Sequence, residues 1–228
     1  MRKKILFLAG MMACCSLAGA QEISKTWVAD KGNGTYQNPV LHADYSDPDV
    51  CAAGDDFYMT ASSFNCIPGI PILHSNDLVN WSLVNYALPI QEPEEFFDKA
   101  QHGKGVWAPA IRFHNGEFYI FWGDPDQGAF MVKARDPKGP WSEPVLVKPG
   151  KGIIDTCPLW DEDGKVYLVH AYAGSRAGLK SVISICELNS DATKAITQSR
   201  IIFDGHEAHE TCEAASYTHL RAHETLMN

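Results

Sequence analysis

The sequence predicts an all-β protein, more specifically part of a β-propeller. Short runs with strand character, rich in aromatic and β-branched residues, occur along most of the chain, for example at 57–60, 118–122 and 166–169. No segment has the length and periodicity of an amphipathic helix, and the best candidate for a short helix is 91–100. The strand runs also repeat along the chain, which favours a propeller over the other all-β architectures.

Three versions of one tight glycine turn each lead into a strand that carries a tyrosine. A unit of roughly 50 residues with four short strands cannot bury both faces of its sheet alone, so neighbouring units must pack on it in a radial arrangement. We therefore expect three four-stranded blades between about residues 40 and 205, whereas propellers close with roughly four to eight. The turns lie at 53–58, 114–119 and 162–167, and the first two units end in an aspartate, a turn and a tryptophan at 77–81 and 136–141.

The N-terminal segment is typical of a signal peptide. Basic residues 2–4 precede an apolar run at 5–17 and a small-x-small cleavage site that ends at Ala20. We expect residues 1–20 to be removed and the protein to be exported to the periplasm or the cell exterior. Lipidation at Cys14 or Cys15 is the less favoured alternative.

The C-terminal segment differs from the repeating region. Residues 214–228 contain no glycine turn, no strand alternation and no aromatic closure. We expect a tail unrelated to the propeller, with a short native helix as the alternative. The predicted organisation is therefore a signal peptide, a partial propeller over 21–213 and this tail.

Composition excludes several classes of protein. Three of the 19 basic residues and no acidic residue lie in the signal segment, so the mature chain carries 16 basic against 28 acidic residues, a net charge of −12. So acidic a chain makes a poor nucleic-acid binder, and no other apolar run approaches the roughly 18 residues that membrane insertion needs. Five cysteines remain after cleavage, and they lack the spacing of a zinc site or a disulfide scaffold. We expect these cysteines to be buried and to act as small hydrophobic residues, with one disulfide as the alternative. They are Cys51, Cys66, Cys157, Cys186 and Cys212.

Three acidic residues stand where blades begin, and each also has an ordinary interpretation. Asp47 precedes a proline, which holds it out of the α region, although a simple Asp-Pro turn is the alternative. Its neighbours Asp44 and Asp49 are expected to cap or to orient. Asp155 lies in an apolar run at the equivalent position of the third blade, where a charge costs several kcal/mol unless it is paired.

The third acid, Glu213, stands where a fourth blade would open, and by itself it is an ordinary surface residue. If the blade starts converge on the propeller axis, the three carboxyl groups meet in one pocket. Two carboxyl groups across a sugar ring are what glycoside hydrolysis requires.

Several short motifs surround these acids. They are Asn38-Pro39-Val40, Asp47-Pro48, Ser62-Ser63-Phe64, Pro68-Gly69-Ile70-Pro71-Ile72, His74-Ser75, Asp77-Leu78-Val79-Asn80-Trp81 and Trp107-Ala108-Pro109-Ala110-Ile111-Arg112. With these motifs the chain closely resembles glycoside hydrolase family 43 over about 38–213. Members of that family are exported, five-bladed and inverting, and include β-xylosidases, α-L-arabinofuranosidases and arabinanases; only about three of the five blades are present here.

The resemblance implies a role for each acid. Asp47 would be the general base, Glu213 the general acid, and Asp155 the residue that tunes the pKa and orientation of the acid. After the general acid the family continues with Gly-Pro, whereas this chain continues with two alanines.

No organic cofactor is implied. In the family an axial histidine of later blades often holds a structural calcium or sodium ion, so such an ion would belong to the full-length parent, and we expect no metal ligand in this chain. The residues implied to line the sugar subsite are Phe64, Trp107, Ala108 and Ile154.

The sequence thus predicts an inverting glycosidase that acts on xylose- or arabinose-containing plant polysaccharides or oligosaccharides. The alternative is a non-catalytic glycan-binding propeller that holds sugar with Phe64, Trp107 and Trp160; a protein-binding scaffold is less favoured, because the strands lack Trp-Asp endings. We expect the 228-residue chain alone to be inactive, since a three-blade arc leaves its two outer faces uncovered.

Overall fold

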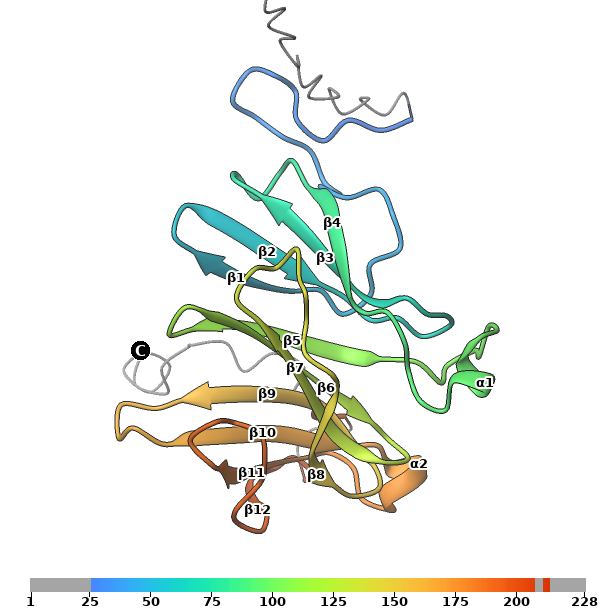
Figure 1. Ribbon diagram of the computed structural model, residues 1–228, viewed down its shortest axis with the longest axis vertical. Helices are drawn as coiled ribbons and strands as arrows, with labels where there is room; N and C mark the ends of the chain where they lie inside the picture. Colours follow the sequence, from blue (N-terminus) through green and yellow to red (C-terminus); the bar gives the residue numbers. More distant parts are fainter. Residues whose placement is uncertain (1–25, 208–210, 214–228) are drawn as a thin grey trace, which may run out of the picture.

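The computed structural model describes residues 26–207 and 211–213, and it confirms the all-β architecture (Figure 1). The described residues form twelve strands in three four-stranded antiparallel sheets, each built from strands that are consecutive in the sequence. This is the arrangement of propeller blades, with the first strand of each blade packed against the first strand of the next. The predicted signal peptide and the predicted tail lie outside the described residues.

The blades follow one another along the chain. Blade 1 contains β1 (Asp49–Ala53), β2 (Asp56–Thr60), β3 (Gly69–Ser75) and β4 (Ser82–Leu88). Blade 2 contains β5 (Trp107–His114), β6 (Glu117–Asp124), β7 (Gly128–Ala134) and β8 (Val145–Pro149). Blade 3 contains β9 (Ile153–Trp160), β10 (Val166–Tyr172), β11 (Val182–Leu188) and β12 (Arg200–Asp204).

The predicted turns are present and have the expected chemistry. His114 pairs with Glu117 across a two-residue turn, in which Asn115 and Gly116 both have positive φ, 49° and 80°. Such values belong to the hairpin turn whose twist matches the strands, and asparagine and glycine adopt them most readily. The predicted strand runs therefore become β2, β6 and β10.

The Asp-turn-Trp closures link the third and fourth strands of the first two blades. Asp77 accepts the backbone N–H groups of Val79 and Asn80 at 2.9 and 2.7 Å, and the indole N–H of Trp81 donates to the Leu78 carbonyl at 3.0 Å. In blade 2 the Trp141 indole makes the same type of bond, to the Pro137 carbonyl at 3.1 Å. Each closure therefore satisfies the polar groups of its own turn.

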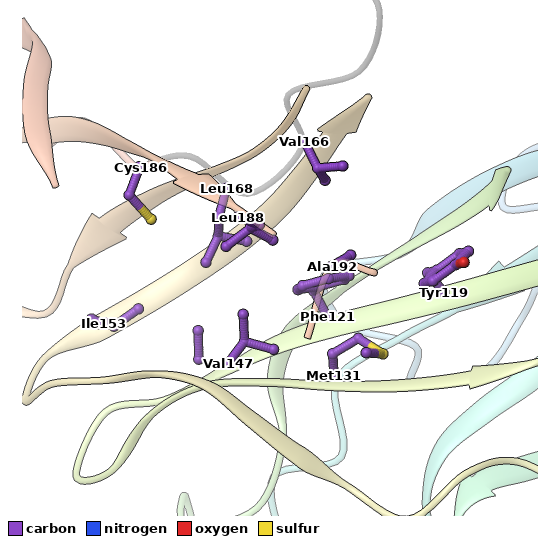
Figure 2. Packing of buried hydrophobic residues seen from close by; sticks show 11 residues of the cluster. Tyr119, Phe121, Met131, Val147, Ile153, Val166, Leu168, Cys186, Leu188 and Ala192 are labelled. Atoms are coloured by element: carbon purple, nitrogen blue, oxygen red, sulfur yellow. The ribbon is translucent and has the colours of Figure 1, made fainter. Parts of the chain in front are cut away.

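Each interface between blades contains an apolar core. Between blades 1 and 2 the buried cluster is Ile70, Ile72, Ala87, Leu88, Val106, Ile111, Phe118, Ile120, Trp122 and Val132. Figure 2 shows the cluster between blades 2 and 3, where side chains of β6, β7 and β8 meet side chains of β9, β10 and β11. Neighbouring blades thus cover one another's faces, as the repeat length requires.

Helices are short, as predicted. Helix α1 (Glu94–Phe97) lies inside the segment proposed for a helix, whereas α2 (Gly174–Ala177) was not predicted, because a single turn leaves no periodic pattern in the sequence. Both lie on the same side of the molecule (Figure 1). No helix among the described residues is long and apolar enough to cross a membrane.

The five cysteines among the described residues are free thiols. Cys157 and Cys186 are buried, as expected, and burial raises the pKa of Cys51 to about 12, with the nearby Asp49 carboxylate adding to the effect. The prediction of a buried residue is wrong for Cys66, which is exposed because it lies in the connection between β2 and β3.

Candidate active site

The start of each blade carries the same backbone irregularity. Asp47, Ala108 and Asp155 have positive φ values of 50°, 37° and 53°, which are uncommon for residues other than glycine. They precede Tyr58, Tyr119 and Tyr167 by 11, 11 and 12 residues, so they occupy the same place in the three repeats. The equivalence of Asp47 and Asp155 that the sequence predicted is therefore confirmed.

Strand pairing shows the irregularity to be a β-bulge. In blade 2, Trp107 pairs with Gly123 and Ala110 with Phe121, so two residues of β5 face one residue of β6. In blade 3, Ile154 pairs with Ala171 and Cys157 with Val169, which places Asp155 and Thr156 opposite His170.

Blade 1 has the same arrangement. The Ser62 N–H donates to the Ser46 carbonyl at 2.9 Å and Asp49 pairs with Thr60, so Asp47 and Pro48 face a single residue. A bulge bends its strand and re-aims one side chain. At this position the re-aimed side chain is an aspartate in blades 1 and 3 and an alanine in blade 2.

Two serines hold the carboxylate of Asp47. Its Oδ2 accepts hydrogen bonds from the hydroxyls of Ser46 and Ser62, at 3.0 and 2.6 Å. The Ser62 oxygen also accepts the backbone N–H of Ala108 at 2.9 Å. Asp47 of blade 1 is thereby linked through one hydroxyl to the bulge of blade 2, while its side chain remains exposed.

Asp155 is held differently, inside the protein. It is 6% exposed, on β9, beside Ile154, which is 4% exposed. The start of β9 lies directly against blade 2: a Cβ on Gly123 would be 2.6 Å from the Ile153 carbonyl oxygen. Only glycine permits this approach without a shift, so the position of Asp155 depends on the backbone of blade 2.

The residues implied to line a sugar subsite lie together. The rings of Phe64 and Trp107 are 6.0 Å apart in an edge-to-face arrangement, and Trp107 packs against the small cluster that contains Ile154. Ala108 follows Trp107 and donates its N–H to Ser62. An aromatic pair beside the oriented carboxylate of Asp47 suits a carbohydrate, which has apolar ring faces and hydroxyl edges.

Glu213 is exposed and lies beyond β12, in irregular structure. The hydrogen bonds that orient Asp47 do not involve it. Its role as general acid therefore stays a prediction.

Trp160 does not belong to the site. It is the last residue of β9, five residues beyond Asp155, or about 17 Å along an extended strand. Its ring stacks on His114 at 4.6 Å and lies 4.9 Å from Tyr119. The prediction that Trp160 could hold sugar together with Phe64 and Trp107 is wrong, because a strand of this length carries it to the opposite end of the blade.

Sequence reasoning missed the polar link beneath the site. The Arg112 guanidinium pairs with the Asp49 carboxylate of blade 1 and donates from Nη2 to Cys157 Sγ of blade 3 at 2.9 Å. The Ile111 N–H also donates to Asp49, at 2.7 Å. Burial alone lowers the pKa of Arg112, but its Cys157 and Asp49 neighbours outweigh this effect and raise it. Arg112 could have been recognised in the sequence, because it is a single charged residue in the apolar run that forms β5.

Within the described ranges, no group of three or more His, Cys, Asp or Glu side chains is arranged to hold a metal ion.

Bulged blade starts, two of which carry an aspartate, next to a pair of aromatic rings define the class of protein: a propeller with acidic residues at its blade starts. The chain belongs to the glycosyl hydrolases family 43, whose model matches residues 36–221. The family and fold that the sequence predicted are thus confirmed.

Several relatives are similar over most of the described chain. A beta-xylosidase of Formosa agariphila is 34% identical over 200 residues, which are 82% of this chain and 34% of the relative. The non-reducing end alpha-L-arabinofuranosidase BoGH43B of Bacteroides ovatus is 39% identical over 139 residues, 59% of this chain and 26% of the relative. The crystal structure of a xylan beta-1,4-xylosidase from Bacillus halodurans matches with a TM-score of 0.63 at 27% identity, covering 78% of this chain and 35% of that one. The chain spans about one third of the length of the first two curated relatives.

Proposed function

We propose that the propeller to which these blades belong is a glycoside hydrolase that cleaves O-glycosidic bonds in xylose- or arabinose-containing plant polysaccharides or oligosaccharides. The observation that carries the proposal is Asp47, held by Ser62 on a strained bulge beside Phe64 and Trp107. The names of the relatives, beta-xylosidase and alpha-L-arabinofuranosidase, support the substrate class. Export through residues 1–20 is part of the proposal, because such polysaccharides lie outside the cell.

In the proposed mechanism the protein supplies a base, an acid and an orienting group. Asp47 takes a proton from a water molecule, which attacks the anomeric carbon as the glycosidic bond breaks. Glu213 gives its proton to the departing oxygen. Asp155, fixed by blade 2, orients the sugar between them and favours the protonated form of Glu213 through like-charge repulsion.

Inversion of the anomeric carbon follows if the base and the acid stand about 6.5 to 9.5 Å apart, which leaves room for the attacking water. NMR of the first sugar released reports its configuration directly. A product with retained configuration would exclude Asp47 as a base and would point to a nucleophile instead.

The test measures pentose release from nitrophenyl xyloside and nitrophenyl arabinofuranoside. It uses the chain itself and a chimera in which residues 36–213 replace the matching third of an active family member, so that closing blades are supplied. Asp47→Ala should lower turnover of the chimera by about 10² to 10⁴, the usual size of general-base assistance.

The matched control is Asp44→Ala, which removes an exposed carboxylate three residues away in the same segment and should leave turnover unchanged. Sedimentation and thermal melting confirm that each variant is folded. Equal turnover of the Asp47→Ala chimera and its parent would remove Asp47 from the mechanism, and a folded chimera without activity would refute the proposed function.

A further inference from the structure

A pocket lies at the margin of the interface between blades 1 and 2, and none of the residues assigned to the candidate active site lines it. Its volume is about 330 Å³, within the range of roughly 300 to 1,000 Å³ that small-molecule sites have. Its walls come from the segment that joins β4 to α1, from β6 and β7, and from the connection between β7 and β8. The lining residues that matter for its chemistry are Gln91, Glu92, Glu94, Trp122, Phe130 and Glu143.

The wall that blade 2 provides is aromatic. The rings of Trp122 and Phe130 are 5.6 Å apart and nearly parallel, with an interplanar angle of 16°. Trp122 belongs to the apolar core between blades 1 and 2, whereas Phe130 is only partly buried. Such a wall offers a large apolar surface, and the electron-rich faces of aromatic rings also attract a cation.

The opposite wall, which includes α1, is held in place by hydrogen bonds. The N–H groups of Phe96 and Phe97 donate to the Pro93 carbonyl at 3.0 and 3.2 Å. The Gln101 side-chain amide donates to the Phe96 carbonyl at 2.6 Å, and the Gln101 N–H donates to the Asn65 carbonyl at 2.7 Å. The wall is therefore formed before any ligand binds, so binding requires little ordering of the chain.

A buried amide at this wall has an acceptor to spare. Gln91 borders the pocket and is 9% exposed, and its Oε1 has no hydrogen-bond partner among the described residues. A buried acceptor without a partner costs stability, which a ligand that donates a hydrogen bond can recover. Gln127, which also lines the pocket, does not meet this need, because its side-chain amide donates to Asp124 at 3.0 Å. Gln91 thus indicates a ligand with a donor group.

The rim of the pocket is acidic. Glu92, Glu94 and Glu143 are exposed and line it, and no lysine, arginine or histidine is among its described lining residues. Glu94 begins α1, whereas Glu143 lies between β7 and β8, so acidic residues stand on both walls. Like charges repel one another, and a bound cation relieves that repulsion. The charge of the rim therefore selects a cation.

We propose that this pocket binds a small organic cation, in which a primary ammonium group is carried on an apolar body. The ammonium group donates to Gln91 and lies among the rim carboxylates, while the apolar body packs on Trp122 and Phe130. A metal ion would leave the aromatic wall unused, and a neutral sugar would leave the acidic rim unused. The inference does not depend on the proposed function, and hydrolysis by the chimera is a separate measurement.

The experiment is calorimetric titration with phenethylammonium chloride and with phenethyl alcohol, which has nearly the same shape but no charge. The protein is the 228-residue chain, and the chimera that carries residues 36–213 is titrated in parallel because it contains the whole pocket. At low salt the ammonium ion should bind about tenfold more tightly than the alcohol. The difference should shrink in about 0.5 M sodium chloride, because salt screens exposed charges.

Variants separate the charge of the rim from the buried acceptor. Glu94→Gln keeps the shape of the rim and should weaken phenethylammonium binding about threefold, and the triple variant with Glu92→Gln and Glu143→Gln should weaken it about tenfold. Neither should change the binding of phenethyl alcohol. Gln91→Met removes the acceptor at similar length and should weaken phenethylammonium binding about three- to tenfold. Thermal melting confirms that each variant is folded.

The matched control is Glu95→Gln. Glu95 follows Glu94 on α1 and is also exposed, but it does not line the pocket. This variant should leave phenethylammonium affinity unchanged. Equal affinity for the ammonium ion and the alcohol, equal effects of Glu94→Gln and Glu95→Gln, or no binding to the folded chimera would each overturn the proposal.

Discussion

The interface between blades 1 and 2 buries a charged pair, whereas that between blades 2 and 3 buries a neutral histidine. Asp49 and Arg112 are 4% and 5% exposed and satisfy each other across the first interface. His170 of blade 3 is fully buried, and its Nε2 lies 2.7 Å from the Ser199 hydroxyl. Its pKa is lowered to about 4, mainly by burial; the Ala171 backbone opposes this effect and Lys148 of blade 2 adds to it.

The two interfaces show two ways in which a repeated blade can bury a polar side chain. An ionised group can be buried when an opposite charge and further hydrogen bonds replace water. A histidine can be buried without a counter-charge because it can give up its proton. The first interface should therefore be sensitive to loss of a partner, and the second to acid.

The largest effect is expected from Arg112→Met. The substitution leaves the Asp49 carboxylate buried without its charged partner, and it should lower the free energy of unfolding by about 3 to 5 kcal/mol. Urea denaturation followed by tryptophan fluorescence measures the change.

Two further variants test the cause. Arg135→Met removes an arginine whose side chain is 88% exposed, and it should change stability little. The double variant with Asp49→Leu and Arg112→Met removes both charges and should recover most of the loss. A double variant as unstable as Arg112→Met alone would show that the loss is one of packing.

The second effect is a loss of stability in acid through His170. Its folded pKa of about 4 lies below the ordinary value of 6.5, so between these values the unfolded chain binds a proton that the folded chain does not. The contribution of His170 to the free energy of unfolding is therefore greatest above pH 6.5. It decreases as the pH falls towards 4 and levels off below that value, and the total decrease is roughly 3 kcal/mol.

The measurement compares the native chain with His170→Gln, which keeps a hydrogen-bonding side chain opposite Ser199 but does not titrate. The free energy of unfolding of each protein is measured at pH 7 and at pH 4.5, and the loss between the two pH values is compared. The native chain should lose more stability than the variant over this range. Parallel losses would mean that His170 is not the group responsible.

The smallest of the three effects is expected from Gly123→Ala, which places a methyl group against the Ile153 backbone. The crowding should cost about 1 to 3 kcal/mol of unfolding free energy and displace the start of β9, and with it Asp155. Gly174→Ala is the control, because a Cβ at this position would first meet the side chain of Lys180, at 3.2 Å, and Lys180 is exposed. Equal effects of the two substitutions would mean that the contact between blades 2 and 3 is not tight at this point.

Much of the local structure could be predicted because it depends on residues close in sequence. The turn at Asn115 and Gly116 and the closure at Asp77 and Trp81 satisfy their own backbone groups, so their chemistry is visible in a few letters. The same repeat also showed that Asp47 and Asp155 are equivalent. Cys66 and Trp160 were misjudged because their surroundings come from other parts of the chain.

The all-β class, the three blades of the described residues, the positions of the hairpins and the residues that begin each blade could all be predicted from the sequence. The contacts across the blades are visible only in the folded protein: Ser62 meets Asp47 and Ala108, and Arg112 meets Asp49 and Cys157. This is because a strand's pattern shows which of its faces is buried, but not which partner covers that face. Partners such as Asp49 and Arg112, 63 residues apart, are chosen by the packing of whole blades.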